Sequence, residues 1–232
     1  MRAVILAGGR GTRLAPYTTV LPKPLMPVGD APILELLIRR LAAAGVSEVT
    51  LAVGHLAALI MAYFGDGSTW SVDISYSTEP EPLGTAGPLK LVAGLDDTFL
   101  VLNGDLLTDL DFAALIAAHR ASEAPATVGI YRRDVRFDLG VVDIDDQHRI
   151  TGYHEKPVQA VLVSMGVYVL EPSVLPLIPT GRFDLPDLVT ALLAAGGTVN
   201  GFLHDGYWLD IGRPDDYERA QADAAHLTAP PA

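Results

Sequence analysis

Residues 1–28 read MRAVILAGGRGTRLAPYTTVLPKPLMPV, and the rest of the chain is organised around this stretch. Residues 3–6 are apolar and partly β-branched, which predicts a short buried strand. This strand runs into Gly8, Gly9 and Gly11. Glycines allow several backbone N–H groups to approach one anion closely. We therefore expect a phosphate-binding turn at the end of the first strand.

The charges around this turn are opposite to the charge of the whole chain, whose formal net charge is -12. Between residues 1 and 29 there is no carboxylate, and the cations are Arg2, Arg10, Arg13 and Lys23. Prolines flank Lys23 on both sides, and they stiffen the backbone and disfavour a helix before them. A lysine on a stiff segment is well suited to face an anion.

Two common nucleotide-binding motifs do not match this turn. The dinucleotide fingerprint G-x-G-x-x-G/A requires glycine or alanine where this chain has Leu14, and the Gly-Lys-Ser/Thr of a Walker A loop is absent. Residues 6–14, LAGGRGTRL, followed by Pro-Lys-Pro at 22–24, instead resemble the opening motif of the sugar-1-phosphate nucleotidyltransferases. The motifs are most similar to those of mannose-1-phosphate guanylyltransferases, and the resemblance extends to about residue 217.

The composition is that of a folded protein with a substantial hydrophobic core. The chain has 232 residues, of which 50% are hydrophobic and 19% are charged, enough for a substantial core. Its acidic balance argues against binding nucleic acid or an anionic membrane surface. Without cysteine it forms no disulfide or thiolate metal site. No apolar run reaches the ~18 residues of a membrane span, so we expect a cytoplasmic protein. The sequence leaves open whether it forms homo-oligomers.

Apolar periodicity predicts alternating helices and strands. Helices are expected at residues 31–44, 56–64, 84–93, 112–121, 186–195 and 214–225. Strands are expected at residues 3–6, 49–53, 72–76, 99–102, 164–170 and 198–203. Such alternation favours βαβ units and a largely parallel sheet. Beyond residue 125, short strands at 127–131, 140–144 and 150–153 predict hairpins laid over the carboxyl edge of the sheet.

We therefore predict an α/β fold. The resemblance implies a three-layer α/β/α Rossmann-like nucleotidyltransferase fold with a mainly parallel mixed sheet and small β-hairpins over the sugar site. Residues 1–232 are predicted to form a single domain, in which 1–124 mainly bind the nucleotide, 125–227 mainly bind the sugar phosphate, and 228–232 form a tail. The resemblance also implies a short form, without the β-helix or acyltransferase extension of some relatives.

Two aspartates are candidate metal ligands. Asp105 follows the strand at 99–102, and ligands bind beyond the carboxyl ends of strands in open α/β sheets. Asp210 interrupts an apolar stretch, where its burial is costly without a positive partner. Oxygen ligands of this kind suit Mg²⁺. Both positions match the metal-binding aspartates of the resembled family, so the resemblance implies Mg²⁺ bound by Asp105 and Asp210.

The loop at residues 79–87, EPEPLGTAG, separates a strand from a predicted helix, as a base-binding loop would. The Glu79 carboxylate accepts two N–H bonds, which suits the edge of guanine better than the mixed edge of uracil. We therefore favour GTP, although uridylyl enzymes with a similar glutamate leave UTP or dTTP open. The predicted nucleotide-binding residues are Leu6, Ala7, Gly8, Gly9, Gly11, Thr12, Arg13, Glu79, Pro82, Gly84 and Thr85.

The second substrate is expected to bind in the later half of the chain. Glu-Lys-Pro at 155–157 matches the family's sugar-phosphate lysine, and Gly140 and Gly166 match glycines near the sugar. Ser164 replaces the usual asparagine, and a hydroxyl forms fewer hydrogen bonds than a carboxamide. The predicted sugar-phosphate residues are therefore Gly140, Glu155, Lys156, Ser164 and Gly166.

The resemblance implies that NTP and a sugar 1-phosphate, from mannose or a related hexose or heptose, give NDP-sugar and pyrophosphate by Mg²⁺-dependent in-line displacement. Arg13 and Lys23 are the predicted catalytic residues, Arg13 for the leaving pyrophosphate and Lys23 for the α-phosphate. One alternative is a non-catalytic regulatory subunit that binds a nucleotide sugar. Another is transfer of CMP or UMP to a different phosphate, such as phosphocholine. The histidines have neither nucleophile nor zinc spacing.

Overall fold

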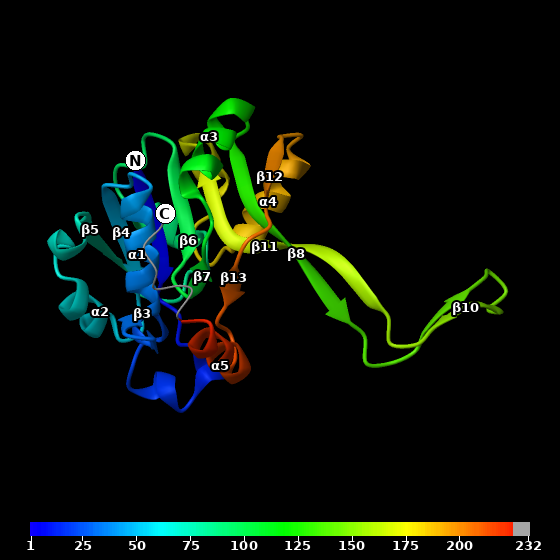
Figure 1. The fold of residues 1–232 in the computed structure, drawn as a ribbon. Helices are drawn as coiled ribbons and strands as arrows, with labels where there is room; N and C mark the ends of the chain where they lie inside the picture. Colours follow the sequence, from blue (N-terminus) through cyan, green and yellow to red (C-terminus); the bar gives the residue numbers. More distant parts are fainter. Residues whose placement is uncertain (225–232) are drawn as a thin grey trace.

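The computed structural model describes residues 1–224, and its centre is one seven-stranded sheet (Figure 1). The strands of this sheet are β1 (Arg2–Ala7), β4 (Glu48–Val53), β5 (Asp73–Thr78), β6 (Phe99–Asn103), β8 (Ala126–Arg136), β11 (Val158–Leu170) and β12 (Val199–His204). Their order is β12-β8-β11-β6-β1-β4-β5. Only β11 runs antiparallel to its two neighbours, β8 and β6. The expected mainly parallel mixed sheet is confirmed.

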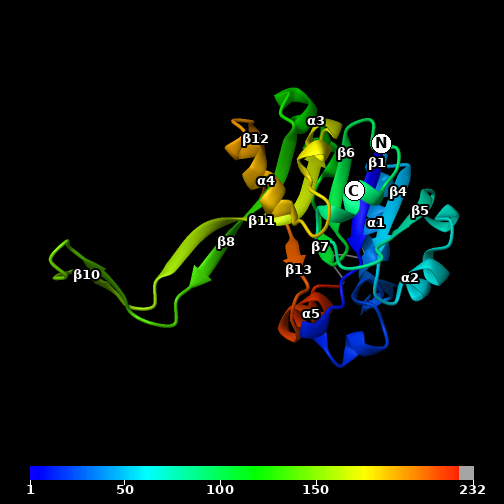
Figure 2. The same cartoon turned by 180° about the vertical axis from the view of Figure 1, so that it is seen from behind.

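Helices cover both faces of the sheet, which makes three layers (Figures 1 and 2). The helices are α1 (Ile33–Ala43), α2 (Ala57–Phe64), α3 (Phe112–Ser122) and α4 (Leu185–Ala194). Successive residues of a strand point to opposite faces. Thus Ile5 packs in one apolar cluster with α1, α2 and α3, whereas Val4 packs in another with Leu188 of α4. Within residues 1–224, no helix combines the length and apolarity needed to cross a membrane.

A third apolar cluster joins the two ends of the described chain. It contains Leu14 and Met26 from the loop after β1, and Leu209 and Ala220 from near the carboxyl end. The short elements around it are β2 (Pro27–Val28), β3 (Ala31–Pro32), β7 (Leu106–Thr108), β13 (Trp208–Asp210) and α5 (Pro214–Ala222). β13 pairs antiparallel with β7, which is the strand that directly follows β6 in the chain. The packing therefore holds the glycine turn beside the end of β6 and beside β13.

The prediction of a helix at residues 84–93 is wrong. This segment contains only a 3₁₀ turn at Gly87–Leu91. The amides of Ala86 and Gly87 both donate to the carbonyl of Phe183, so they are fixed by another segment. The strands β7 and β13 have three residues each, too few to show a periodic pattern. Helix α5 ends at Ala222, and the expected tail at 228–232 lies outside the described residues.

The hairpins expected over the carboxyl edge of the sheet are also placed differently. β8 pairs with β12 only as far as Tyr131, and it continues beyond the sheet paired with β11. β9 (Val141–Ile144) and β10 (Ile150–His154) form an antiparallel hairpin at the far end. We call residues 132–163 the arm. Both views show the arm projecting away from the body of the protein (Figures 1 and 2).

Candidate functional site

The glycine turn after β1 borders a cavity of about 270 Å³. The residues that line it are Leu6, Ala7, Gly9, Gly11, Thr12, Arg13, Lys23, Pro24 and Asp105. All except Pro24 are residues predicted from the sequence. The fold therefore brings the glycines and two cations of the loop together with a carboxylate from the end of β6, which is an arrangement suited to phosphates.

The conformation of the turn requires glycine at position 11. Gly11 has φ of 59°, in the left-handed region that side chains disfavour. A Cβ atom there would also lie 2.9 Å from the Cγ2 atom of Thr18. The hydroxyl of Thr18 donates to the Gly11 carbonyl at 2.8 Å, and the amide of Leu14 donates to the same carbonyl at 2.9 Å. The backbone of the turn is thus fixed by its own loop.

Lys23 and Asp105 form an ion pair at the base of this cavity. Lys23 is buried, and its Nζ donates to Oδ2 of Asp105. The other carboxylate oxygen, Oδ1, is buried and has no hydrogen-bond partner among residues 1–224. A buried acceptor without a donor is unfavourable, so a positive ligand at Oδ1 would lower the free energy of this arrangement.

β13 places Asp210 beside Asp105. Asp210 is in register with Leu106, the residue after Asp105, and the amide of Ile211 donates to the Asp105 carbonyl at 3.2 Å. Desolvation and the neighbouring Asp105 carboxylate raise the pKa of Asp210, while Lys23 and Arg13 act in the opposite direction. The two carboxylates are therefore close enough to repel one another.

These two aspartates fit a divalent cation. A cation would satisfy Oδ1 of Asp105 and would remove the repulsion between Asp105 and Asp210. The described part of the chain has no cluster of three or more histidine or acidic side chains suited to a metal. Phosphate oxygens and water would therefore supply the remaining ligands, as is usual for Mg²⁺.

A second cavity, of about 370 Å³, adjoins the first and shares Leu6, Gly9 and Asp105 with it. Its remaining lining residues are Gly8, Glu79, Pro82, Gly84, Thr85, Asn103, Arg182 and Asp184. Sequence reasoning missed three of these, Asn103, Arg182 and Asp184. Arg182 and Asp184 precede α4, and an aspartate at such a position is usually interpreted as a helix cap. Only the fold brings these two residues next to the loop at residues 79–87.

Glu79 lies against the glycine turn in this second cavity. Its Oε2 accepts the amide of Leu83 at 3.0 Å, and a Cβ atom at Gly8 would lie 2.5 Å from its Oε1. Burial raises the pKa of Glu79, and the hydrogen bond from the Leu83 amide lowers it. One oxygen therefore stabilises the loop itself, which leaves the lone pairs of Oε1 and the second lone pair of Oε2 for a ligand.

The same loop is attached to the start of α4. The amide of Thr85 donates to Oδ1 of Asp184 at 2.9 Å, and its hydroxyl accepts the amide of Leu185 at 2.7 Å. Gly84 has φ of 82°, and a Cβ atom there would lie 2.6 Å from the Phe183 carbonyl oxygen. Gly84 and Thr85 thus have a structural role, because they hold the loop against the start of α4.

The sequence profile of the family described as nucleotidyl transferase matches residues 2–226. The chain belongs to this family. It is 39% identical to the mannose-1-phosphate guanylyltransferase of Mycobacterium tuberculosis, over 98% of this chain and 66% of that protein. It is 37% identical to the UTP–glucose-1-phosphate uridylyltransferase of Synechocystis sp., over 95% of this chain and 62% of that protein.

The fold of this nucleotidyl transferase is also that of solved relatives. A putative glucose-1-phosphate thymidylyltransferase from Bacillus anthracis superposes with a TM-score of 0.76 and 25% identity, over 97% of this chain and 95% of that chain. The curated sequence relatives are longer, and this chain spans less than two thirds of their length.

The five predicted sugar-phosphate residues of the nucleotidyl transferase fall into two groups. Ser164 and Gly166 lie on β11 near the second cavity, because a Cβ atom at Gly166 would clash with the side chain of Asn103, which lines it. The other three lie on the exposed arm, and they are Gly140, Glu155 and Lys156. The structure does not bring these three to the corner that holds Asp105, and their role stays a prediction.

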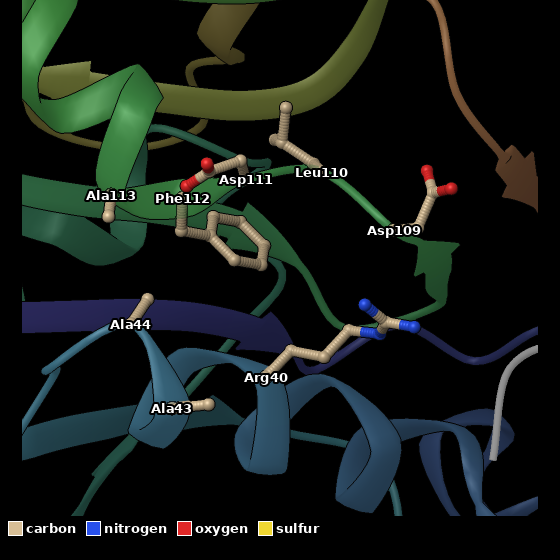
Figure 3. A pocket seen from close by; sticks show the side chains of 8 residues that line it. All are labelled: Arg40, Ala43, Ala44, Asp109, Leu110, Asp111, Phe112 and Ala113. Carbon is tan, nitrogen blue, oxygen red and sulfur yellow. The ribbon is translucent and has the colours of Figure 1, made fainter. Parts of the chain in front are cut away.

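Two further cavities contain none of the predicted nucleotide-binding residues. One, of about 430 Å³, lies between α1 and the start of α3, and the Arg40 guanidinium points toward the side of the cavity on which Asp109 lies (Figure 3). Asp109 Oδ1 accepts the Tyr207 amide at 2.6 Å and lies 2.9 Å from His204 Nε2, so Asp109 fastens β7 to the segment before β13. The other, of about 420 Å³, lies beside Asp210 at the root of the arm.

We expect the Lys23–Asp105 pair to be important for stability. Lys23→Met should lower the free energy of unfolding by about 1–3 kcal/mol, because both carboxylate oxygens of Asp105 then lack a protein partner. Urea unfolding followed by circular dichroism measures this. The double variant Lys23→Met/Asp105→Leu should lose less than the single variant, since no unpaired charge remains.

Arg149→Met is the matched control, because it breaks the exposed pair with Asp145. Its effect should stay below about 1 kcal/mol. Equal losses for Lys23→Met and Arg149→Met would contradict the assignment of a structural role to the Lys23–Asp105 pair.

Proposed function

We propose that this nucleotidyl transferase transfers a nucleoside monophosphate from an NTP to a sugar 1-phosphate and releases pyrophosphate. One observation carries the proposal: the glycine turn, Lys23 and Asp105 line one cavity, which continues to Glu79, and Asp210 lies beside Asp105. Similarity to a guanylyltransferase and a uridylyltransferase that use sugar 1-phosphates supports the same reaction class.

The chain's own groups account for most of the proposed catalysis. Amides of the glycine turn and Arg13 would bind the triphosphate, with Arg13 on the leaving pyrophosphate. Lys23 would stabilise negative charge that develops at the α-phosphate. The sugar phosphate is already ionised at neutral pH, so positioning and charge neutralisation suffice without a strong general base.

Mg²⁺ is the proposed metal, bound by Asp105 and Asp210. When bound, it supplies positive charge that neutralises the phosphate oxygens. Oδ1 of Asp105, which has no hydrogen-bond partner among the residues that the structure describes, and the raised pKa of Asp210 both support a cation at this position. Lys23 holds the other oxygen of Asp105, which fixes the orientation of the carboxylate toward such an ion.

GTP is the proposed nucleotide, and mannose 1-phosphate or a related hexose or heptose 1-phosphate is the proposed acceptor. Glu79 supports guanine, because two N–H donors of that base match an ionised carboxylate. The second candidate is a uridylyl or thymidylyl transfer to a sugar phosphate. It is favoured by the bond from Leu83, which occupies part of the Glu79 acceptor capacity, and by the similarity to a uridylyltransferase.

Arg13→Ala should lower kcat/KM by ~10²-fold or more, as the loss of one donor to a transition state typically does. The measurement is pyrophosphate release with a saturating sugar 1-phosphate. Arg10→Ala is the matched control, because Arg10 belongs to the same loop but does not line the cavity. Full activity of Arg13→Ala would reject the proposed role of Arg13.

Removal of divalent ions with EDTA should abolish pyrophosphate release, and added Mg²⁺ should restore it. Asp210→Asn should raise the half-saturating Mg²⁺ concentration by about tenfold or more, because one charged ligand is lost. A Mg²⁺ titration of the thermal midpoint in the presence of GTP gives the same comparison without turnover. Asp215→Asn on α5 is the control, and an unchanged Mg²⁺ requirement in Asp210→Asn would contradict the metal site.

Glu79→Gln should lower kcat/KM for GTP by about tenfold or more, because an amide replaces one acceptor oxygen with a donor. The value for UTP should change less. Pyrophosphate release across five nucleotides and a panel of sugar 1-phosphates measures both, with Glu81→Gln in the same loop as control. A wild-type preference for UTP or dTTP would favour the second candidate instead.

A further inference from the structure

The arm is an exposed apolar surface. Nine of the seventeen large hydrophobic side chains that are exposed in the described chain lie on it, and they are Val135, Phe137, Leu139, Val142, Ile144, Ile150, Tyr153, Val158 and Leu162. Leu139 is 77% exposed and Ile150 is 66% exposed. Exposed apolar side chains gathered in one segment mark a surface that binds a partner.

The side chains of the arm gain little stabilisation from the rest of the described chain. Within residues 1–224, every hydrogen bond and ion pair of its side chains joins two arm residues, such as His154 with Asp143 at 2.9 Å and Arg149 with Asp145 at 2.7 Å. A two-stranded ribbon without a covered face is only marginally stable in water. We therefore expect the arm to pack against the surface of another molecule rather than against the rest of its own chain.

The arm also carries two polar side chains that the catalytic corner lacks. Lys156 follows Glu155 where the chain returns from the tip, and it adopts φ of 44°, which is unusual for a residue with a side chain. The amide of Phe137 donates to the Pro157 carbonyl at 3.0 Å across this crossing. The strained backbone is thus held in one conformation, as at sites where a side chain must be positioned.

Lys156 is remote from its own corner. Lys156 precedes Ser164, at the root of the arm, by eight positions of nearly extended chain, which corresponds to about 26 Å at ~3.3 Å per residue. Figure 1 shows this length directed away from the body. The corner that holds Asp105 and Asp210 therefore has no lysine from the arm of the same chain.

We infer that the arm packs on a second copy of this chain and delivers Glu155 and Lys156 to the sugar-phosphate site of that copy. The inference rests on the proposed function and names the partner of the same site. A second copy has the same corner without this pair, and a reciprocal exchange gives a closed two-fold dimer.

The charge distribution fits this partner. The arm has five arginine or lysine residues and six carboxylates, so almost all of the net charge of -12 lies on the rest of the chain. A nearly neutral arm can lie on the acidic body of another copy without the repulsion that two bodies would experience. The arm's apolar side chains and its guanidinium groups are thus suited to a surface of this same protein.

The decisive experiment combines two inactive variants of the full chain. Arg13→Ala impairs the corner and Lys156→Ala impairs the arm, and both side chains are exposed, so neither change should disturb folding. Each homodimer should lose activity by ~10²-fold. Co-expression with two different tags and tandem purification gives the heterodimer, which should recover about half of the wild-type activity because one of its two sites has both residues.

The outcomes separate the two levels of the proposal. If both homodimers are inactive and the heterodimer recovers no activity, the arm serves its own chain and the inference is overturned while the proposed function stands. Full activity of the Lys156→Ala homodimer overturns the delivery of Lys156. Full activity of the Arg13→Ala homodimer rejects the proposed catalytic corner, and the inference fails with it.

The dimer itself is tested by light scattering on the eluting protein. The wild-type chain of 24.6 kDa should elute at twice this mass. The double variant Leu139→Asp/Ile150→Asp should be monomeric and inactive, with an unchanged circular dichroism spectrum. Leu193→Asp, at a 56% exposed position on α4, is the control and should remain a dimer. A monomeric wild-type protein would overturn the inference.

Discussion

The ion pair between Lys23 and Asp105 connects the two segments on which the candidate site depends. Lys23 belongs to the loop after β1 and Asp105 to the turn after β6, and these strands are neighbours in the sheet. The loop is otherwise anchored by apolar residues such as Leu14 and Met26, which fix its position but orient no polar group toward the cavity. The ion pair is therefore the contact that orients charge at this corner.

The electrostatic balance at this corner is unfavourable in the protein alone. One oxygen of Asp105 accepts from Lys23, and the other has no hydrogen-bond partner in the described part of the chain. Desolvation and the Asp105 carboxylate raise the pKa of Asp210. An uncharged side chain in place of Asp210 would remove this repulsion and stabilise the folded protein. The retention of both carboxylates beside a glycine turn is understandable if phosphate and a cation bind together, because each ligand compensates the charge of the other.

The residues that line the cavity at the glycine turn could be predicted to lie together because they belong to short local motifs. The strand, the glycines and Pro-Lys-Pro occupy one stretch, and Asp105 directly follows a strand. Contacts between distant segments could not be predicted in this way. Thr85 binds Asp184 because two loops meet in space, and no periodic pattern marks the three-residue strands β7 and β13.

The arm shows a different limit of sequence reasoning. Residues 132–136 alternate little between apolar and polar, so the pattern does not reveal that β8 continues beyond the sheet. A motif such as Glu155-Lys156 identifies side chains suited to a phosphate, but its position in the sequence does not state which copy of the chain they serve. Parallel strands collect side chains at their carboxyl edge, whereas a strand that continues past the edge carries them away. The geometry of the arm, rather than the motif, therefore decides where this lysine acts.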